Sequence, residues 1–494
     1  MTALERAIHD PAPVRAFGRR SPLEGLDRQS VGFVDVMAQS VSAVAPAAAA
    51  TTVTGLVAGV SAGAVVVSVL VAGVLSLLMA GTVGQFARRL AASGALYTYA
   101  ARSFGPRGGL ATGAAVLVGY GAIAMFALLG GAHYTRLLLR PITPEIDTPL
   151  GIGAIVLAES ALLTIVLVRG IRLSARVALV VELASVALIA ALLTLLLTRI
   201  GPIDPASLLP SGSDSALGVA AGALIALTAY VGFESATTLG VEARAPLRTI
   251  PRAIRATVIV SLVLYLLAAV TQVAGFAGLG RDLSRSASPV NDLANAFGLG
   301  GWAVLADAGI AASFLACAIG STTALARVLF AMGRDGVLGA TVGRTHARYG
   351  TPIGAISVSL PIVVAVPLTL AVTGVDLRAA MHLTLAIGGV GYIVSYALVC
   401  LAAPVFLRRI GESTQAAVVM SWVAAIALLA AVVAFAAADV SSGSPAMAVA
   451  IAIAVVAAIA IAWRLRRPLG TLGAYDVPVA DAVLGGVARD DPDG

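Results

Sequence analysis

Long apolar runs alternate with short polar segments along this chain. The runs lie near residues 31–58, 61–86, 108–138, 150–168, 174–198, 215–240, 254–279, 301–328, 353–373, 380–407, 417–438 and 444–464. An α-helix needs about 20 mostly apolar residues to cross a bilayer, and each run comes close to that length or exceeds it. The pattern predicts an all-α integral membrane protein with twelve transmembrane helices.

Composition supports this prediction. Of the 494 residues, 59% are hydrophobic and 12% are charged, and the mean hydropathy is +0.98. A soluble protein carries about a quarter charged residues. The two cysteines, Cys317 and Cys400, lie inside apolar runs, so we expect no disulfide framework. The first 30 residues have no apolar core, and we therefore expect no cleavable signal peptide.

The net charge of +7 comes from arginine alone, because the chain contains no lysine. With the N-terminus placed in the cytoplasm, 26 of the 32 basic residues fall in cytoplasmic segments. The six on the other side are Arg136, Arg140, Arg199, Arg281, Arg285 and Arg378. The positive-inside rule thus predicts that both termini are cytoplasmic. The basic charge is explained by topology, and we expect no nucleic-acid partner.

Two of the twelve runs contain residues that interrupt a helix. The first run reads VGFVDVMAQSVSAVAPAAAATTVTG and has Pro46 near its middle; the sixth reads ALIALTAYVGFESATTLG and has Gly232 and Glu234 there. Proline removes a backbone donor, and freed backbone groups are tolerated in a membrane where they line a cavity or meet a ligand. Paired breaks in corresponding positions indicate a transporter built from inverted repeats. The alternative is two kinked helices that bind nothing.

Three segments carry a family resemblance. GFESATTLGVEARAPLRTIPRAI, Gly232 to Ile254, resembles the sixth-span signature of the amino acid–polyamine–organocation (APC) superfamily. ARRLAASGALYTYAARSFGPRGG, Ala87 to Gly109, is similar to its segment between spans two and three. RVLFAMGRDGVLGATVGRTHARYGTPIGAI, Arg327 to Ile356, resembles its loop after span eight. The matches run in order over about residues 30–410.

The resemblance implies a LeuT-like fold and secondary transport by alternating access in the plasma membrane. Residues 31–410 would form the transporter core, with inverted repeats at about 31–198 and 215–408. Residues 411–467 would form two peripheral helices. Residues 1–30 and 468–494 would be cytoplasmic tails. The substrate would be an amino acid or a related small amine, moved by proton symport or exchange. The alternatives are a polyamine or amine uniporter and a transporter-derived sensor.

The resemblance also implies where substrate binds. A substrate carboxylate would meet backbone N–H groups at the first break, and its amino group would meet carbonyls of both breaks. The residues concerned are Ser42, Ala43, Val44 and Ala45 at the first break, and Tyr230, Val231, Gly232 and Phe233 at the second. The chain departs from the family here, because the first break has no glycine. The substrate could then be an unusual amino acid or an amine without a carboxylate.

Thr228 and Tyr230 are further candidates for substrate contact. Thr228 stands where some arginine-exchanging relatives carry a bulky aromatic gate, and threonine argues against that exchanger type. Tyr230 is then the nearest aromatic residue that could close over substrate. It could equally be a packing residue.

Glu234 is the candidate for proton coupling. A charged side chain at the bilayer centre costs roughly 2.5–3.5 kcal/mol on insertion scales, so it is usually paired, protonated or functional. The alternatives are a structural glutamate that bonds its own broken helix and a residue that contacts substrate. Glu159 and Glu182 are the other deep carboxylates.

A weaker prediction concerns an ion site between spans five and eight. Proton-coupled relatives often place a lysine in span five, where sodium-coupled ones hold an ion. This chain has Ser185 near that position, and Ser321 and Thr322 in span eight could face it. Ordinary packing of small residues is the alternative. No metal, nucleotide or catalytic motif is present, so we expect no cofactor, no metal and no enzymatic activity. The expected partners are a small-molecule substrate, protons and the lipid bilayer.

Overall fold

The computed structural model describes residues 23, 25–61, 63–210, 216–286, 288–442 and 445–476. Most of the N-terminal tail and residues 477–494 lie outside these ranges. Within them the chain is helical and contains one isolated β-bridge, between Val31 and Ala243. Twelve helices are long and apolar enough to cross a membrane, as the hydropathy pattern predicts.

The first repeat contains five spans, the first of which is broken. These are α2 (Phe33–Val44) with α3 (Pro46–Ser61), α4 (Val65–Ala87), α5 (Ala95–Leu139), α6 (Pro149–Arg169) and α7 (Ile171–Ile200). Short 3₁₀ turns, η1 (Pro144–Asp147) and η2 (Pro205–Leu208), flank the last two.

The second repeat repeats this order. It consists of α8 (Ala216–Thr228) with the 3₁₀ helix η3 (Phe233–Leu239), α9 (Pro246–Gly278), α11 (Gly300–Arg334), α12 (Ile353–Val372) and α13 (Leu377–Arg409). The turn η4 (Leu283–Arg285) and the short α10 (Pro289–Ala296) lie between α9 and α11. The last two spans are α14 (Gln415–Ser442) and α15 (Ala446–Leu465).

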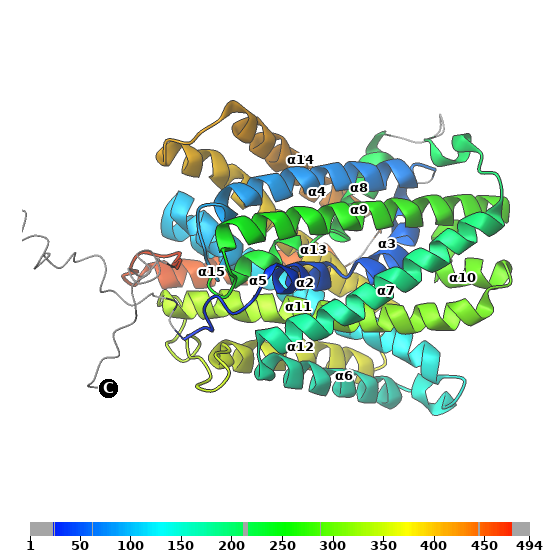
Figure 1. Ribbon diagram of the computed structural model, residues 1–494, viewed down its shortest axis with the longest axis horizontal. Coiled ribbons are helices and arrows are strands. Elements are labelled where there is room, and N and C mark those ends of the chain that lie inside the picture. Colours follow the sequence, from blue (N-terminus) through cyan, green and yellow to red (C-terminus); the bar gives the residue numbers. More distant parts are fainter. Residues whose placement is uncertain are drawn as a thin grey trace, which may run out of the picture.

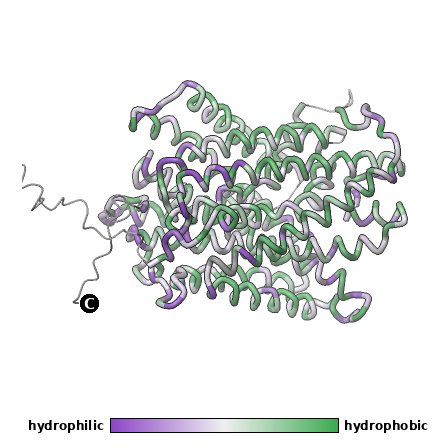
Figure 2. The backbone as a smooth tube through the Cα atoms, in the orientation of Figure 1, coloured by the Kyte–Doolittle hydropathy of each residue, from purple (hydrophilic) through white to green (hydrophobic). Residues whose placement is uncertain are grey.

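The spans run roughly along the long axis of the molecule (Figure 1). One end holds the segment before α2 and the C-terminal segment after α15; we call it the N/C end. The other end holds η1, η4 and α10, and we call it the far end. Hydrophilic residues gather toward the two ends and leave hydrophobic spans between them (Figure 2). This distribution suits a bilayer-spanning bundle.

The broken spans α2–α3 and α8–η3 lie inside the bundle. In the apolar 18-residue stretch of each span, 67% of the residues are buried in the first span and 72% in the sixth, but only 6% in α15. Burial of the interrupted spans matters because the backbone groups freed at a break must find partners within the protein. The last two helices are peripheral, as expected.

The third span begins earlier than the sequence predicted. Helix α5 starts at Ala95 rather than near residue 108, and Gly105, with φ 73°, interrupts it. The added turns bury Leu96, Tyr97 and Tyr99 completely or nearly so. Their packing explains why this interhelical segment is helical despite its Gly105-Pro106 pair.

Candidate functional site

The first break is one residue long. Ala45 adopts left-handed angles, φ 49° and ψ 62°, and separates α2 from α3. Its N–H donates to Val41 O at 2.9 Å, so the hydrogen-bond pattern of α2 extends to Ala45. Pro46 then opens α3 without a donor of its own. The N–H groups that become available here are therefore those of the first turn of α3, beginning at Ala47.

The second break is longer. Helix α8 ends at Thr228, and η3 begins after Gly232, whose φ is 100°. Protein groups satisfy much of the broken backbone: Tyr265 donates to Ala229 O at 2.7 Å, and Ser40 donates to Phe233 O at 2.6 Å. Gly232 N–H donates to the Tyr396 hydroxyl at 3.3 Å.

The two breaks touch each other. A Cβ added to Gly232 would lie 2.8 Å from Ala43 O. Gln39 of α2 links the breaks to a third element, α11. Its side-chain amide donates to Gly320 O of α11 at 2.8 Å, and its backbone carbonyl accepts from the Ser235 hydroxyl of η3 at 3.0 Å. The predicted pairing of the interrupted spans is thus a direct contact.

A small cavity of about 30 Å³ lies at this junction. Of the expected substrate residues, Ala43, Val44, Ala45, Thr228 and Val231 line it. Phe126 of α5 and Phe314 of α11 provide aromatic walls that the sequence did not single out. Ser42, Gly232 and Phe233 lie at the same breaks but are not part of the lining.

Tyr230 is directed elsewhere. Its ring meets that of Tyr265 edge-on at 4.9 Å between centroids, and a Cβ added to Gly73 of α4 would lie 3.0 Å from its hydroxyl. The side chain therefore packs between α4 and α9 and is not part of the cavity lining.

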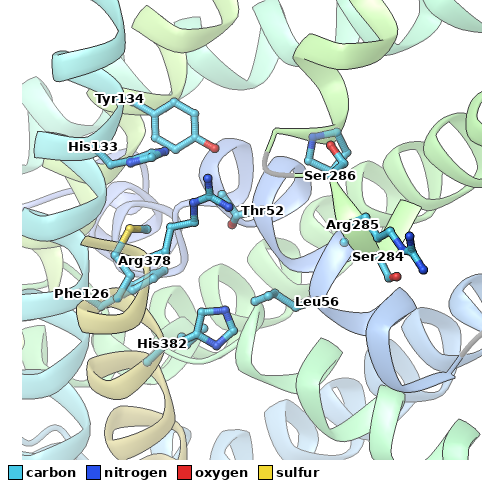
Figure 3. A pocket seen from close by; sticks show the side chains of 14 residues that line it. Thr52, Leu56, Phe126, His133, Tyr134, Ser284, Arg285, Ser286, Arg378 and His382 are labelled. Atoms are coloured by element: carbon cyan, nitrogen blue, oxygen red, sulfur yellow. The ribbon is translucent and has the colours of Figure 1, made fainter. Parts of the chain in front are cut away.

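Two larger cavities on the far-end side share wall residues with the small one. One, of about 440 Å³, shares Thr228 and Leu385 with it. The other, of about 210 Å³, shares Thr52, Phe126 and Leu385 with it. Figure 3 shows Arg378 projecting into this second cavity, with Tyr134, His133 and His382 around it.

Glu234 of η3 lies on the other side of the breaks, toward the N/C end. Its side chain is fully buried. One carboxylate oxygen accepts from the Tyr120 hydroxyl of α5 at 2.7 Å, and the other accepts from the Tyr396 hydroxyl of α13. One carboxylate thus joins η3 to two helices of the surrounding bundle. The tyrosines were missed because nothing local marks them; they become partners only through the packing of α5 and α13.

A second closure lies nearer the N/C end. Arg327 of α11 makes two hydrogen bonds to Glu242, at 2.7 and 2.9 Å, and both side chains are almost completely buried. Glu242 follows η3, so this pair links the end of the second broken span to α11. The bridge between Val31 and Ala243 lies beside this pair.

The C-terminal segment 468–476 lies against the same end. Asp335 accepts from the Tyr97 hydroxyl at 2.7 Å and from Gly473 N–H at 2.6 Å. Burial raises the pKa of Asp335 above its ordinary value, and the hydrogen bond from Tyr97 works in the opposite direction. Asp476 pairs with Arg28 at 2.7 Å.

The structure does not bring together the residues of the expected ion site. Ser185 donates to Val181 O of its own helix, and Gly309 of α11 lies beside it. Ser321 and Thr322 are twelve and thirteen residues farther along α11, which is about 18–20 Å at 1.5 Å per residue. Among the described residues no group of three or more His, Cys, Asp or Glu side chains could hold a metal ion.

Comparison with known proteins decides the family. The model of the family described as "Amino acid permease" matches residues 35–467. The chain belongs to the amino acid permease family. Its members are permeases, so the expectation of a transporter rather than an enzyme is confirmed, as is the predicted APC membership.

Individual relatives of this permease are distant. The vacuolar cationic amino acid transporter 4 of Arabidopsis thaliana is 28% identical over 319 residues, covering 59% of this chain and 50% of that protein. The branched-chain amino acid permease BcaP of Lactococcus lactis is 28% identical over 316 residues, covering 60% of this chain and 67% of that protein. The match thus spans half to two-thirds of these relatives.

A solved structure confirms the fold. The manganese transporter mutant H236A of Eremococcus coleocola superimposes with a TM-score of 0.54 at 15% identity, covering 87% of this chain and 94% of that one. At this identity the likeness concerns fold alone, and the predicted LeuT-like architecture is confirmed.

Proposed function

We propose that this permease is a secondary active transporter of an amino acid or a related small amine. Substrate binds at the junction of the two breaks, where the small cavity lined by Ala43 to Ala45 and Thr228 adjoins the two larger ones that share its wall at Leu385. The small cavity alone has room for about one water molecule. The proposal is supported by the difference between the two sides of that cavity. Larger cavities lie on the far-end side, while Glu234 and the Arg327–Glu242 pair close the N/C side. Such an arrangement is what one state of an alternating-access carrier requires.

The location is part of the same proposal. The protein lies in the plasma membrane, and the arginine distribution supports placing both termini in the cytoplasm. The N/C end is then cytoplasmic, and the cavities face outward. Both named relatives transport amino acids according to their names, which supports the substrate class.

Glu234 is the proton-coupling residue in this proposal. Ionised, its carboxylate accepts one hydroxyl hydrogen from each of two helices. Protonated, one oxygen becomes a donor and can no longer accept in the same way. Protonation therefore weakens the closure on the cytoplasmic side and links proton binding to the change of access. A carboxyl with no cation beside it can change its protonation state without leaving another charge unpaired.

Counterflow in proteoliposomes tests the transport proposal. Vesicles are loaded with an unlabelled amino acid or amine, and a trace of the same labelled compound is added outside. A carrier gives a transient, saturable accumulation of label, because exchange is faster than net flux. A channel-like uniporter or a sensor gives none. Absence of counterflow across a panel of amino acids and polyamines would contradict the proposal.

A further inference from the structure

Glu182 of α7 places a buried carboxylate at the first turn of α3. One of its oxygens accepts from Ala47 N–H at 3.2 Å and from the Ser313 hydroxyl of α11 at 3.0 Å. The Ser313 oxygen in turn accepts from Ala48 N–H at 3.1 Å. Three spans thus meet at the start of the half-helix that follows the first break.

These bonds use the donors that a ligand carboxylate would need. The first N–H groups of a helix have no intrahelical partner and carry partial positive charge. Pro46 contributes no donor, Ala47 and Ala48 are bonded to Glu182 and Ser313, and Ala49 donates to Ala45 O at 3.0 Å. A substrate carboxylate arriving here would find no free donor and another carboxyl group already in place.

The unpartnered second oxygen of Glu182 indicates a ligand of positive charge. It is buried and has no hydrogen-bond partner, and the side chain is 0% exposed. A buried carboxylate without a cation is costly. Arg327, the buried arginine of α11, is already bound through two bonds to Glu242, and the chain has no lysine.

The substrate cavity shares this turn. Ala48 lines it, and Ala48 is two hydrogen bonds away from the Glu182 carboxylate through Ser313. Cys317, one turn along α11 from Ser313, lines it as well. In a site of low dielectric, opposite charges attract each other more strongly than they do in water. The other cavity walls are mainly alanine, valine and phenylalanine.

We infer that the substrate is an organic amine without a carboxylate, whose ammonium group is balanced by Glu182. The inference rests on the proposed transport function and narrows its substrate class. Glu182 takes the place at the half-helix that a substrate carboxylate would otherwise occupy. The glycine-free first break agrees with this, since Ala43 to Ala45 leave no additional N–H group for an anion.

Matched pairs of compounds test the inference. Putrescine is ornithine without its carboxylate, and agmatine is arginine without its carboxylate. Competition against counterflow gives an apparent affinity for each compound with the full chain in proteoliposomes. We expect putrescine and agmatine to compete about tenfold or more better than ornithine and arginine. This ratio is measured on the wild-type protein and needs no variant.

Glu182→Gln then tests the residue. We expect it to reduce the preference for the amine to below about threefold in both pairs. Glu159→Gln is the control: Glu159 is a partly buried carboxylate of α6 that accepts a hydrogen bond from Thr135 and lies outside the residues that line the cavity. It should keep the wild-type ratio. A wild-type protein that prefers ornithine and arginine, or an unchanged ratio in Glu182→Gln, would overturn this inference alone. Absence of counterflow with every compound overturns the proposed function and the inference with it.

Discussion

Glu234 is the residue on which the coupling proposal depends. Glu234→Gln keeps the shape of the side chain but fixes it in an uncharged form. We expect its uptake to lose the pH dependence of the wild type, while ligand binding measured by thermal shift stays detectable. Uptake that keeps the wild-type pH profile would refute the coupling role and leave the structural alternative.

The tyrosines around Glu234 provide a related test. Tyr396→Phe removes one donor to the carboxylate and keeps the ring that stacks on Phe233 at 5.3 Å. We expect the pH profile of uptake to shift, because the ionised form of Glu234 loses a hydrogen bond worth about 1.5–3 kcal/mol. Tyr349→Phe, at an exposed tyrosine near the N/C end, is the control and should leave the profile unchanged.

The buried pair of Arg327 and Glu242 should show strong non-additivity. Removing one partner leaves a buried charge uncompensated, which costs about 3–5 kcal/mol. We expect Arg327→Ala and Glu242→Ala each to lower the melting temperature in detergent more than the double substitution does. Losses that simply add would mean that the two side chains do not stabilise each other.

At the scale of elements, the contact between the two breaks is the feature to test. Gly232 has a φ that disfavours other residues, and an added Cβ would lie 2.8 Å from Ala43 O. Gly232→Ala should therefore abolish uptake while the protein still inserts in the membrane. Gly84→Ala in α4 is the control, because its Cβ would meet no atom within 4 Å. Normal uptake by Gly232→Ala would show that the close contact is dispensable.

At Ala45 we expect the reverse substitution, from alanine to glycine, to be tolerated. An alanine in the left-handed region costs roughly 1–2 kcal/mol relative to glycine. Ala45→Gly should keep uptake and hold or raise the melting temperature, whereas Ala45→Val should lower both. A loss of stability in Ala45→Gly would indicate that its methyl group packs usefully at the break.

The sequence predicted the elements better than their contacts. Twelve spans and both breaks could be located because apolar length, Pro46 and Gly232 are local signals. The partners of Glu234 could not, since Tyr120 and Tyr396 lie far from it in the chain and meet it only after folding. Glu182 was visible as a deep carboxylate, but its position at the start of α3 depends on how α7 crosses the first break. The early start of α5 was missed because a Gly-Pro pair normally indicates a loop.

At the scale of the whole molecule, the C-terminal segment ties together elements at the N/C end. Asp335 accepts a hydrogen bond from Gly473 N–H, and Arg28 forms an ion pair with Asp476. The guanidinium of Arg102 lies 4.4 Å from the ring centroid of Tyr475. Asp335→Ala should expose the segment and accelerate chymotrypsin cleavage after Tyr475. Asp282→Ala, at an exposed residue of the far end, is the control. An unchanged cleavage rate would mean that Asp335 does not hold the segment.

Concentrative uptake driven by a proton gradient is the decisive measurement for proton-coupled transport by this permease. Wild-type protein is placed in sealed vesicles with an acidic exterior and an alkaline interior, and an amine or amino acid that gives counterflow is added outside. We expect its internal concentration to rise above the external one and to collapse when a protonophore removes the gradient. Flux that never exceeds equilibrium and ignores the protonophore would contradict it.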